Sequence, residues 1–548
     1  MEATGTDTRK NEMKYEKSEL ELMTTYQLRE ICRREKIMNG VIHPLDKEEL
    51  IQTIMRYMGK RQDFFICDRK KGGEERVEEF LKKTRIVIKP SEELYCQSQI
   101  LAYEGLSIEY YDDYTIPYKK ELAGTNAFLI GSDKTLCAIL NLKEHGGKRE
   151  KLYLTKAAEL ETRETQRKDY RIFCMGRQNS ECMYHLYYGE QTILPEHIEV
   201  YSIPLIDFVV RKPVTLMLPM AIDFGSVNTT AGVYLDSAYF ENVGEQAAVK
   251  NCRENEINYT AFEDGNGESM LLPSVIGVLA VEEEDYKLLF GYDAIRLANA
   301  SYVDEGFCVF YDVKRWIGEY DKEEEIVDRQ GRRRLVKRAE ILRRFFLYII
   351  RKTENRFKCR ISQVHISSPV KQKHYFRRMF REILPEYMTD QETMLDEGMA
   401  VLYNTISNML EQETLEENEE YEALIIDCGG GTTDLCSYRF RIQDRRAAYK
   451  IYMETAYENG DTDFGGNNLT YRIMQILKIA LVRAKGNQNV SSVKEILEYM
   501  DTDIYRFIDS HGVKAFYQYL EQEYRKAEET LPTHFADFER YNRSEYYK

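Results

Sequence analysis

Apolar residues recur at helical spacing in two short segments near the start of the chain. In Thr24–Lys36 the apolar positions lie three and four residues apart, and threonines are available as N-caps. A second stretch, Asp46–Met58, has the same spacing, begins at an aspartate that can cap a helix and is followed by Gly59. The pattern therefore predicts two amphipathic helices that can bury little area except against each other.

The pattern changes to short β-type runs between residues 85 and 219. These runs are rich in β-branched and aromatic residues and are broken by glycine and charged turns. We expect one β-rich domain here, with a helix near Ala157–Arg167 and with Tyr184–Tyr188 as a strand whose aromatic rings pack on its neighbours. Five segments are expected: a flexible lead-in (1–19), a helical module (20–61), a helical linker (62–84), the β-rich domain (85–219) and a C-terminal unit (220–548).

Two apolar runs flank a tight turn in Ala221–Leu235. The first run contains Asp223, and the turn holds Gly225, Ser226, Val227 and Asn228. Backbone amides in such a turn make an anion-binding nest, and a glycine lets a phosphate come close to the backbone. The segment predicts a β-hairpin with an anion site at its turn. By itself this is weak evidence, because many strand turns contain aspartate and glycine for conformational reasons.

The same arrangement recurs in Leu424–Phe440, where Asp427 and three successive glycines, 429–431, stand between two apolar runs. Such a glycine run weakens a hairpin and favours a close approach of the backbone to another group. Two hairpins of this kind can face each other across a cleft and hold the phosphates and metal of one nucleotide. Neither contains the Walker pattern GxxxxGK[ST], and neither opens a helix as a dinucleotide-binding fingerprint does.

The two hairpins resemble the phosphate motifs of the actin-like ATPase superfamily of actins, sugar kinases and heat-shock chaperones. Three further segments, in the family's order, are similar to the DnaK-type chaperone branch: Asp312–Gly318, Asp396–Tyr403 and Gly460–Leu469. The resemblance covers Ala221 to about Leu531. It implies an α/β fold with two ribonuclease-H-like lobes in residues 220–548. Because the family's ATPase domain continues to another adenosine-binding glycine motif, it also implies that this domain is incomplete at its C-terminal end.

The resemblance assigns roles to individual residues and implies ATP or ADP and Mg²⁺ as cofactors. Asp223 and Asp427 would hold a hydrated Mg²⁺ ion, since Mg²⁺ prefers oxygen ligands. Lys314 would neutralise charge at the terminal phosphate, and Glu397 with Asp427 would orient the attacking water. Asp434 would support the second hairpin. Thr432 is assigned to the catalytic group and would also contact the nucleotide. The remaining glycine and turn residues would contact the nucleotide as well: Gly225, Ser226, Val227, Asn228, Gly429, Gly430, Gly431, Gly465 and Gly466.

Residues 20–61 resemble a SAP-type motif, a helix-extended-helix module that family members use on DNA or sometimes RNA. The matching residues are Leu22, Leu28, Arg29, Ile31, Cys32, Glu49, Leu50 and Ile51. The residues expected to contact phosphates are Arg29, Arg33, Arg34, Lys36 and Lys47. The alternative interpretation is an amphipathic helical hairpin that docks another protein.

Composition narrows the classes of protein that fit. The 77 basic and 93 acidic residues give a formal charge of −16, so any nucleic-acid contact must be a local basic patch. No run approaches the roughly 20 apolar residues of a membrane span, and the first residues lack the apolar run of a secretory signal. The 11 cysteines show neither a disulfide framework nor paired zinc-ligand spacing. These features predict a cytoplasmic protein without a membrane partner.

Two functional hypotheses follow. The first is a DnaK-like ATPase whose nucleotide cycle opens and closes two lobes, coupled to N-terminal modules that bind a protein client or nucleic acid. The second is a nucleotide-gated scaffold or filament protein of the actin kind, with little hydrolysis. A sugar-kinase-like phosphotransferase would need a catalytic aspartate in a substrate cleft, and the sequence offers no compelling candidate.

Overall fold

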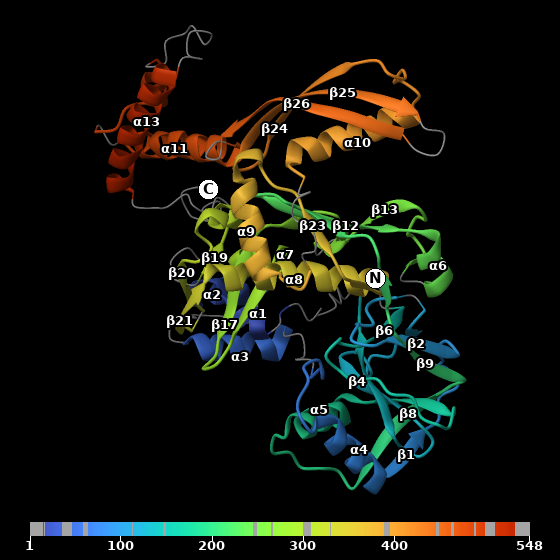
Figure 1. Ribbon diagram of the computed structural model, residues 1–548. Coiled ribbons are helices and arrows are strands. Elements are labelled where there is room, and N and C mark those ends of the chain that lie inside the picture. Colours follow the sequence, from blue (N-terminus) through green and yellow to red (C-terminus); the bar gives the residue numbers. More distant parts are fainter. Residues whose placement is uncertain are drawn as a thin grey trace, which may run out of the picture.

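The computed structural model is a mixed α/β structure (Figure 1). It describes residues 15, 17–35, 46–58, 64–111, 113–145, 150–244, 249–264, 267–299, 308–328, 330–387, 395–444, 449–461, 465–486, 489–498 and 510–531. The sequence-based prediction of the α/β class is confirmed. No helix among these residues is long and apolar enough to cross a membrane.

Three short helices pack together at the start of the chain: α1 (Lys17–Glu21), α2 (Thr25–Arg34) and α3 (Lys47–Met58). The Thr24 side chain accepts a hydrogen bond from the Gln27 amide at 3.3 Å, and the Gln27 side chain accepts one from the Thr24 amide at 2.9 Å. This reciprocal pair is a capping box that fixes where α2 begins. The two predicted helices are confirmed, and their apolar faces bury Leu28, Ile31, Cys32, Leu50, Ile51 and Ile54 against each other.

A curled seven-stranded sheet follows, with the strand order β1-β8-β7-β4-β5-β6-β3. Only the β1–β8 pair is parallel. Helices α4 (Gly73–Lys83) and α5 (Arg177–Tyr188) pack on one face and share its core. The strands are β1 (Arg85–Lys89), β3 (Thr115–Pro117), β4 (Thr125–Ile130), β5 (Leu136–Lys143), β6 (Lys151–Thr155), β7 (Tyr170–Met175) and β8 (His197–Leu205). Beside them β2 (Gln99–Tyr103) pairs in parallel with β9 (Asp207–Arg211).

Two local predictions in this region were wrong. Tyr184–Tyr188 belongs to α5 and not to a strand, because its buried aromatic side chain, Tyr187, packs on Gly73 of α4, where a Cβ would lie 2.6 Å from the ring. The segment Ala157–Arg167 contains no helix. Its polar groups are bound by neighbours instead: the buried Lys156 ammonium donates to the carbonyls of Ala157 and Leu160, each at 2.8 Å.

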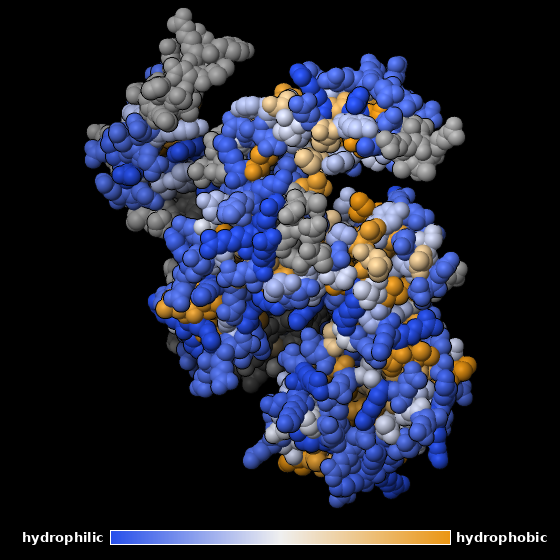
Figure 2. All heavy atoms as spheres, viewed as in Figure 1, coloured by the Kyte–Doolittle hydropathy of each residue, from blue (hydrophilic) through white to orange (hydrophobic). Residues whose placement is uncertain are grey.

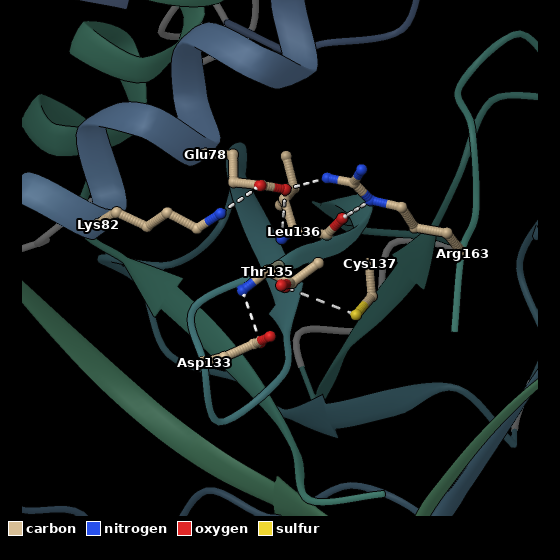
Figure 3. Close-up of polar contacts among 7 residues, drawn as sticks. All are labelled: Glu78, Lys82, Asp133, Thr135, Leu136, Cys137 and Arg163. Atoms are coloured by element: carbon tan, nitrogen blue, oxygen red, sulfur yellow. Dashed lines mark hydrogen bonds and ion pairs between the residues drawn. The ribbon is translucent and has the colours of Figure 1, made fainter. Parts of the chain in front are cut away.

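A charged cluster attaches α4 to the first residue of β5 (Figure 3). The Glu78 carboxylate accepts hydrogen bonds from the Lys82 ammonium at 2.6 Å and the Leu136 amide at 3.0 Å, and it also pairs with the Arg163 guanidinium. Arg163 Nε donates to the Leu136 carbonyl at 2.7 Å. Burial opposes ionisation of Glu78, but these donors outweigh burial and lower its pKa. Because the opposite charges of this cluster pair with one another, its role is structural: it holds α4 against β5.

The first part of the C-terminal unit is built on a mixed sheet with the order β13-β12-β11-β23. Strand β11 (Met220–Phe224) pairs antiparallel with β12 (Asn228–Leu235) and parallel with β23 (Val364–Ile366). Helices α8 (Arg338–Phe357) and α9 (Lys373–Ile383) contribute to the core beneath β11, where Phe224 contacts Phe346. Strands β13 (Glu256–Tyr259) and β16 (Leu272–Pro273) pair with β12.

Smaller elements surround this sheet, and several of them form short antiparallel pairs. They are α6 (Ser237–Val243), β14 (Phe262–Glu263), β15 (Glu268–Ser269), β17 (Ile276–Val281), β18 (Tyr286–Phe290), α7 (Tyr292–Asn299), β19 (Val309–Phe310), η2 (Val313–Glu319), β20 (Glu323–Val327), β21 (Arg333–Lys337) and η3 (Val370–Gln372).

The second part of the C-terminal unit contains an antiparallel sheet with the order β24-β25-β26. In the sequence, helices precede and follow this sheet. Helix α10 covers one face of this sheet (Figure 1). The elements are α10 (Glu397–Glu411), β24 (Tyr421–Cys428), β25 (Thr433–Asp444), β26 (Tyr449–Asp461), α11 (Gly466–Ala484), α12 (Val493–Glu498) and α13 (Ser510–Thr530). Helices α11, α12 and α13 share a separate small core.

The seven-stranded sheet is joined to the first part of the C-terminal unit by a continuous buried core. Strand β10 (Val214–Leu216) pairs in parallel with β22 (Cys359–Ile361) across the junction. The buried Lys358 ammonium donates to the Ser107 carbonyl at 2.7 Å and lies 4.8 Å from the centre of the Tyr111 ring. Burial lowers the pKa of Lys358 to about 7. The two regions are thus packed together as one body.

Candidate functional site

The first predicted hairpin is formed by β11 and β12. Asp223 pairs with Thr230, and the turn is closed by a hydrogen bond from the Gly225 amide to the Asn228 carbonyl at 3.1 Å. A Cβ on Gly225 would lie 2.4 Å from the same Asn228 oxygen, so glycine is required by the turn itself. Ser274 supports the turn, because its hydroxyl donates to the Gly225 carbonyl at 2.6 Å.

The second predicted hairpin, formed by β24 and β25, has the same register and the same turn. Asp427 pairs with Asp434, and the Gly429 amide donates to the Thr432 carbonyl at 2.9 Å. In both hairpins the aspartate lies two residues before the turn amide and faces a residue seven positions later. The two segments are therefore alike in local structure as well as in sequence.

The turns of the two hairpins meet directly. A Cβ on Gly430 would lie 2.3 Å from Cγ2 of Val227, and a Cβ on Gly431 would lie 2.6 Å from Oγ of Ser226. Residues 430 and 431 must therefore be small for the two turns to approach this closely. The sequence predicted that the glycine run lets the backbone come close to another group. In the structure, this group is the turn of the first hairpin.

The glycine pair at residues 465 and 466 lies behind the second turn, where α11 begins. The Gly466 amide donates to the Gly429 carbonyl at 2.9 Å, and the Asn467 amide donates to the Gly430 carbonyl at 2.7 Å. In a trans peptide the N–H and C=O point in opposite directions. The amides of Gly430 and Gly431 therefore point away from α11, which leaves them as adjacent donors of the kind that bind anions.

A buried ion pair lies beside the hairpins. Lys314, on η2, is only 4% exposed, and its Nζ lies 2.8 Å from Oε1 of Glu397, the first residue of α10. The start of α10 is fixed because the Asp396 side chain accepts from the Met399 amide at 2.7 Å. The Glu397 amide also donates to the Ser368 carbonyl at 3.0 Å. The backbone of Glu397 is thus fixed by hydrogen bonds at the start of α10.

Five predicted site residues act on one another electrostatically. Burial raises the pKa of Glu397 to about 7; Lys314 opposes this shift, whereas the charges of Asp223 and Asp434 add to it. Burial also raises the pKa of Asp434, again with a lowering effect from Lys314 and a raising effect from Asp427. The structure therefore brings together in one place four carboxylates and one lysine from four segments that are far apart in the sequence.

The pKa of Asp223 is raised as well, first by burial and further by the charge of Asp427. Lys314 and a hydrogen bond from the Ser367 hydroxyl, at 3.3 Å, work in the opposite direction. Carboxylates that resist ionisation in this way are stabilised by a nearby cation. Among the described residues, no group of three or more His, Cys, Asp or Glu side chains is arranged to hold a metal ion directly.

Two further residues of the site were not predicted from the sequence. Ser367, directly after β23, is the hydroxyl donor to Asp223. Asp312 adopts a left-handed backbone with φ of 53°, pairs with Arg315 at 2.6 Å and places Oδ1 3.3 Å from where a Cβ of Gly431 would lie. The sequence signal for it was its place at the start of the Asp312–Gly318 segment, two residues before Lys314.

The predicted phosphate-contacting residues of the helical module lie in different surroundings. Arg33 is half exposed and pairs with Glu30 at 2.6 Å, whereas Arg34 donates to the Tyr15 hydroxyl at 2.6 Å. Arg29 is half-buried on α2, and Lys47 is exposed at the start of α3. Lys36 lies outside the described residues.

A comparison with protein-family models found no match for this chain, and a comparison with curated proteins found none either.

Proposed function

We propose that the chain binds ATP with Mg²⁺ between its two hairpins and hydrolyses it as a DnaK-like ATPase of the actin-like superfamily. The observation that carries the proposal is the pair of hairpins with identical register, whose turns meet and whose aspartates lie beside a buried Lys–Glu pair. Turn amides and glycines supply donors for phosphate oxygens, while Asp223 and Asp427 supply oxygen donors for hydrated Mg²⁺. Bound Mg²⁺ would neutralise phosphate charge.

The Lys314–Glu397 pair provides groups suited to hydrolysis. A carboxylate with a pKa of about 7 can accept a proton from water near neutral pH, and Lys314 can turn toward a phosphate oxygen as negative charge develops there. Because the ammonium already lies 2.8 Å from Glu397, phosphate binding would draw it away and leave Glu397 free to orient water. This proposed role of Glu397 is general-base or water-positioning catalysis.

The contact between the turns also suggests how nucleotide could change the shape of the protein. Val227 and Ser226 of the first turn lie against Gly430 and Gly431 of the second. A phosphate group inserted beside these turns would have to change their separation, and each turn is attached to a different sheet. We therefore propose that the nucleotide cycle opens and closes the two halves, with the seven-stranded sheet moving with the first half.

The test is a measurement of Mg-dependent ATP turnover by the full chain. Asp427→Asn and Glu397→Gln are each expected to lower kcat by about 10²-fold or more, since each removes a charge at the reacting phosphate. Glu422→Gln is the matched control: it lies on β24 like Asp427 but is exposed and pairs with Arg439 at 3.1 Å. Circular dichroism checks that each variant is folded.

Turnover that is unchanged in both site variants would exclude this mechanism. Tight Mg-ATP binding without turnover in the unaltered protein, together with nucleotide-dependent polymers in sedimentation, would instead support the nucleotide-gated scaffold of the actin kind.

For the helical module we propose weak nucleic-acid binding through the exposed basic residues of α2 and α3. The full chain is expected to shift a 20-base-pair DNA duplex or a single-stranded RNA at low salt, and the shift should weaken as salt rises. Arg33→Glu should weaken it further, whereas Lys494→Glu, at an exposed position on α12, should not. No shift of either nucleic acid at low salt would instead favour a protein-docking role.

A further inference from the structure

The first turn of α10 packs against β25 of the second hairpin. A Cβ on Gly398, the second residue of α10, would lie 2.7 Å from Sγ of Cys436 and 3.3 Å from the hydroxyl oxygen of Tyr438. Glycine is a poor helix former, so its presence inside a helix indicates a packing requirement. A larger residue at position 398 would push the start of α10, and with it Glu397, away from the second hairpin.

The side chains of β25 that meet this turn lie on the buried face of its sheet. Cys436 and Tyr438 follow Asp434 by two and four residues, so all three project from the same face. Helix α10 covers this face, where its Leu402 and Ile406 contribute to the shared core. By comparison, the surface of this sheet that is visible in Figure 2 is mainly hydrophilic. The start of α10 is therefore packed on the face that carries an acidic residue of the candidate site.

The Tyr438 hydroxyl reaches the residue that caps α10. It donates a hydrogen bond to Oδ1 of Asp396 at 3.2 Å, and the same oxygen accepts the Met399 amide at 2.7 Å. Tyr438 and Asp396 are only 0% and 1% exposed. Burial raises the pKa of Tyr438, and a hydrogen bond to Cys436 and the charge of Asp396 raise it further. The hydroxyl therefore keeps its proton and acts as a donor to the buried carboxylate that fixes the start of the helix.

Asp396 also contacts the first part of the C-terminal unit. Nζ of Lys373, the first residue of α9, lies 3.6 Å from Oδ2 of Asp396. Asp396 also forms a parallel β-bridge with Ser368, two residues after the end of β23. A buried carboxylate is costly unless it is paired and hydrogen-bonded. Asp396 is therefore stabilised from both parts, by an ammonium of the first and a hydroxyl of the second.

We propose that Tyr438 is a positioning residue for Glu397: by holding Asp396, its hydroxyl fixes the first turn of α10 against the strand that carries Asp434. Glu397 follows Asp396 directly, so a shift of Asp396 moves the backbone from which the Glu397 carboxylate projects. Small misplacements of a catalytic group lower the rate of the chemical step. The effect on turnover rests on the ATPase function proposed above, whereas the hold on the start of α10 does not.

The first test is turnover of Mg-ATP by the full chain with Tyr438→Phe, which removes the hydroxyl and keeps the ring. We expect kcat to fall about tenfold and KM to change by less than about twofold, because the hydroxyl affects hydrolysis and not binding. In the Glu397→Gln background, the same substitution should lower the residual kcat by less than about twofold, since the group that it positions is already lost. Tyr239→Phe is the matched control: Tyr239 is 2% exposed, donates to the Phe357 carbonyl at the end of α8, and should leave kcat unchanged when substituted.

The second test is hydrogen–deuterium exchange of the full chain without nucleotide. The amides of Glu397 and Met399 donate to the Ser368 carbonyl and the Asp396 side chain, so their exchange reports on the start of α10. Tyr438→Phe should speed this exchange about tenfold, whereas the control at position 239 should leave it unchanged. If the unaltered chain hydrolyses no ATP, the ATPase proposal fails alone, and exchange still decides whether the hydroxyl fixes the position of Glu397.

Two outcomes would overturn the proposal. One is the same exchange at the start of α10 in Tyr438→Phe and in the unaltered chain, which would show that the hydroxyl does not hold this turn. The other is an equal loss of kcat from Tyr438→Phe with and without Glu397→Gln, which would show that the hydroxyl acts by another route. Circular dichroism checks folding. If Tyr438→Phe does not fold, Gly398→Ala displaces the same turn from the helix side. A kcat that Gly398→Ala leaves unchanged would then overturn the proposal.

Discussion

The two hairpins have the same local structure and opposite surroundings. Each has an aspartate two residues before a glycine turn, and each turn is closed by one amide-to-carbonyl hydrogen bond across three residues. Yet the strand of the first hairpin is buried between two neighbours, whereas the strand of the second is an exposed edge. The short sequence motif determines the geometry of the turn and the place of the aspartate, while more distant segments determine how stable each strand is.

The largest expected effect tests this difference in burial with one substitution at two equivalent positions. Ile222→Lys should lower the free energy of unfolding by about 4 kcal/mol or more, because it places a charge in a closed core. Ile426→Lys should change it by less than about 1 kcal/mol, because that side chain already faces water. Urea unfolding can be followed by the fluorescence of the single tryptophan, Trp316, which packs against the core of the first half.

Ile222→Val and Ile426→Val serve as controls, since they change size at the same positions without adding charge. If the two lysine variants lost the same free energy of unfolding, Ile426 would be as buried as Ile222. The two hairpins would then not differ in burial.

The second-largest effect is on the pH dependence of stability, and it comes from Glu397. The pKa of this carboxyl is affected by Asp223 of the first hairpin and by Asp434 of the second. Its pKa is raised from 4.5 to about 7, so between these values the folded protein binds more protons than the unfolded chain. Stability contributed by this group is therefore present below about pH 4.5 and is lost as pH rises to about 7, by on the order of 3 kcal/mol. Glu397→Gln should remove this decline.

The measurement is the free energy of unfolding between pH 5 and pH 8, for Glu397→Gln and the unaltered chain. Asp223→Asn and Asp434→Asn should each move the decline to lower pH, since each removes a negative charge near Glu397. If only one of the two variants moved the decline to lower pH, Glu397 would interact with one hairpin alone. The two hairpins would then not meet at Glu397.

The sequence predicted those parts of the structure that depend on short-range pattern. Both hairpins were found from apolar runs that flank a turn containing glycine, and the two N-terminal helices were found from helical apolar spacing and capping residues. Tyr184–Tyr188 was misread because a short aromatic run fits either period, and only contact with Gly73 of α4 decides it. The hydroxyl of Ser367 and the fit of Val227 against Gly430 depend on segments that are far apart in the chain, so no local pattern could reveal them.

The smallest effect separates glycines required by their own turn from those required by the opposite turn. Gly225→Ala places a Cβ 2.4 Å from a backbone oxygen of the same hairpin, so the turn must distort, at a cost of about 1–3 kcal/mol. Gly430→Ala places a Cβ 2.3 Å from the tip of the Val227 side chain, which is half exposed and can move, so we expect a loss below about 1 kcal/mol. Val227→Ala should restore stability to Gly430→Ala but not to Gly225→Ala.

A double-mutant cycle in the free energy of unfolding measures this coupling directly. Coupling between residues 227 and 430, with none between 227 and 225, would show that the two turns touch in solution. If residues 227 and 430 were instead independent, the turns would be separated in the nucleotide-free protein. The glycine run would then have to be explained by a ligand and not by the opposite hairpin, because among the described residues no other atom lies within 3 Å of a Cβ at position 430.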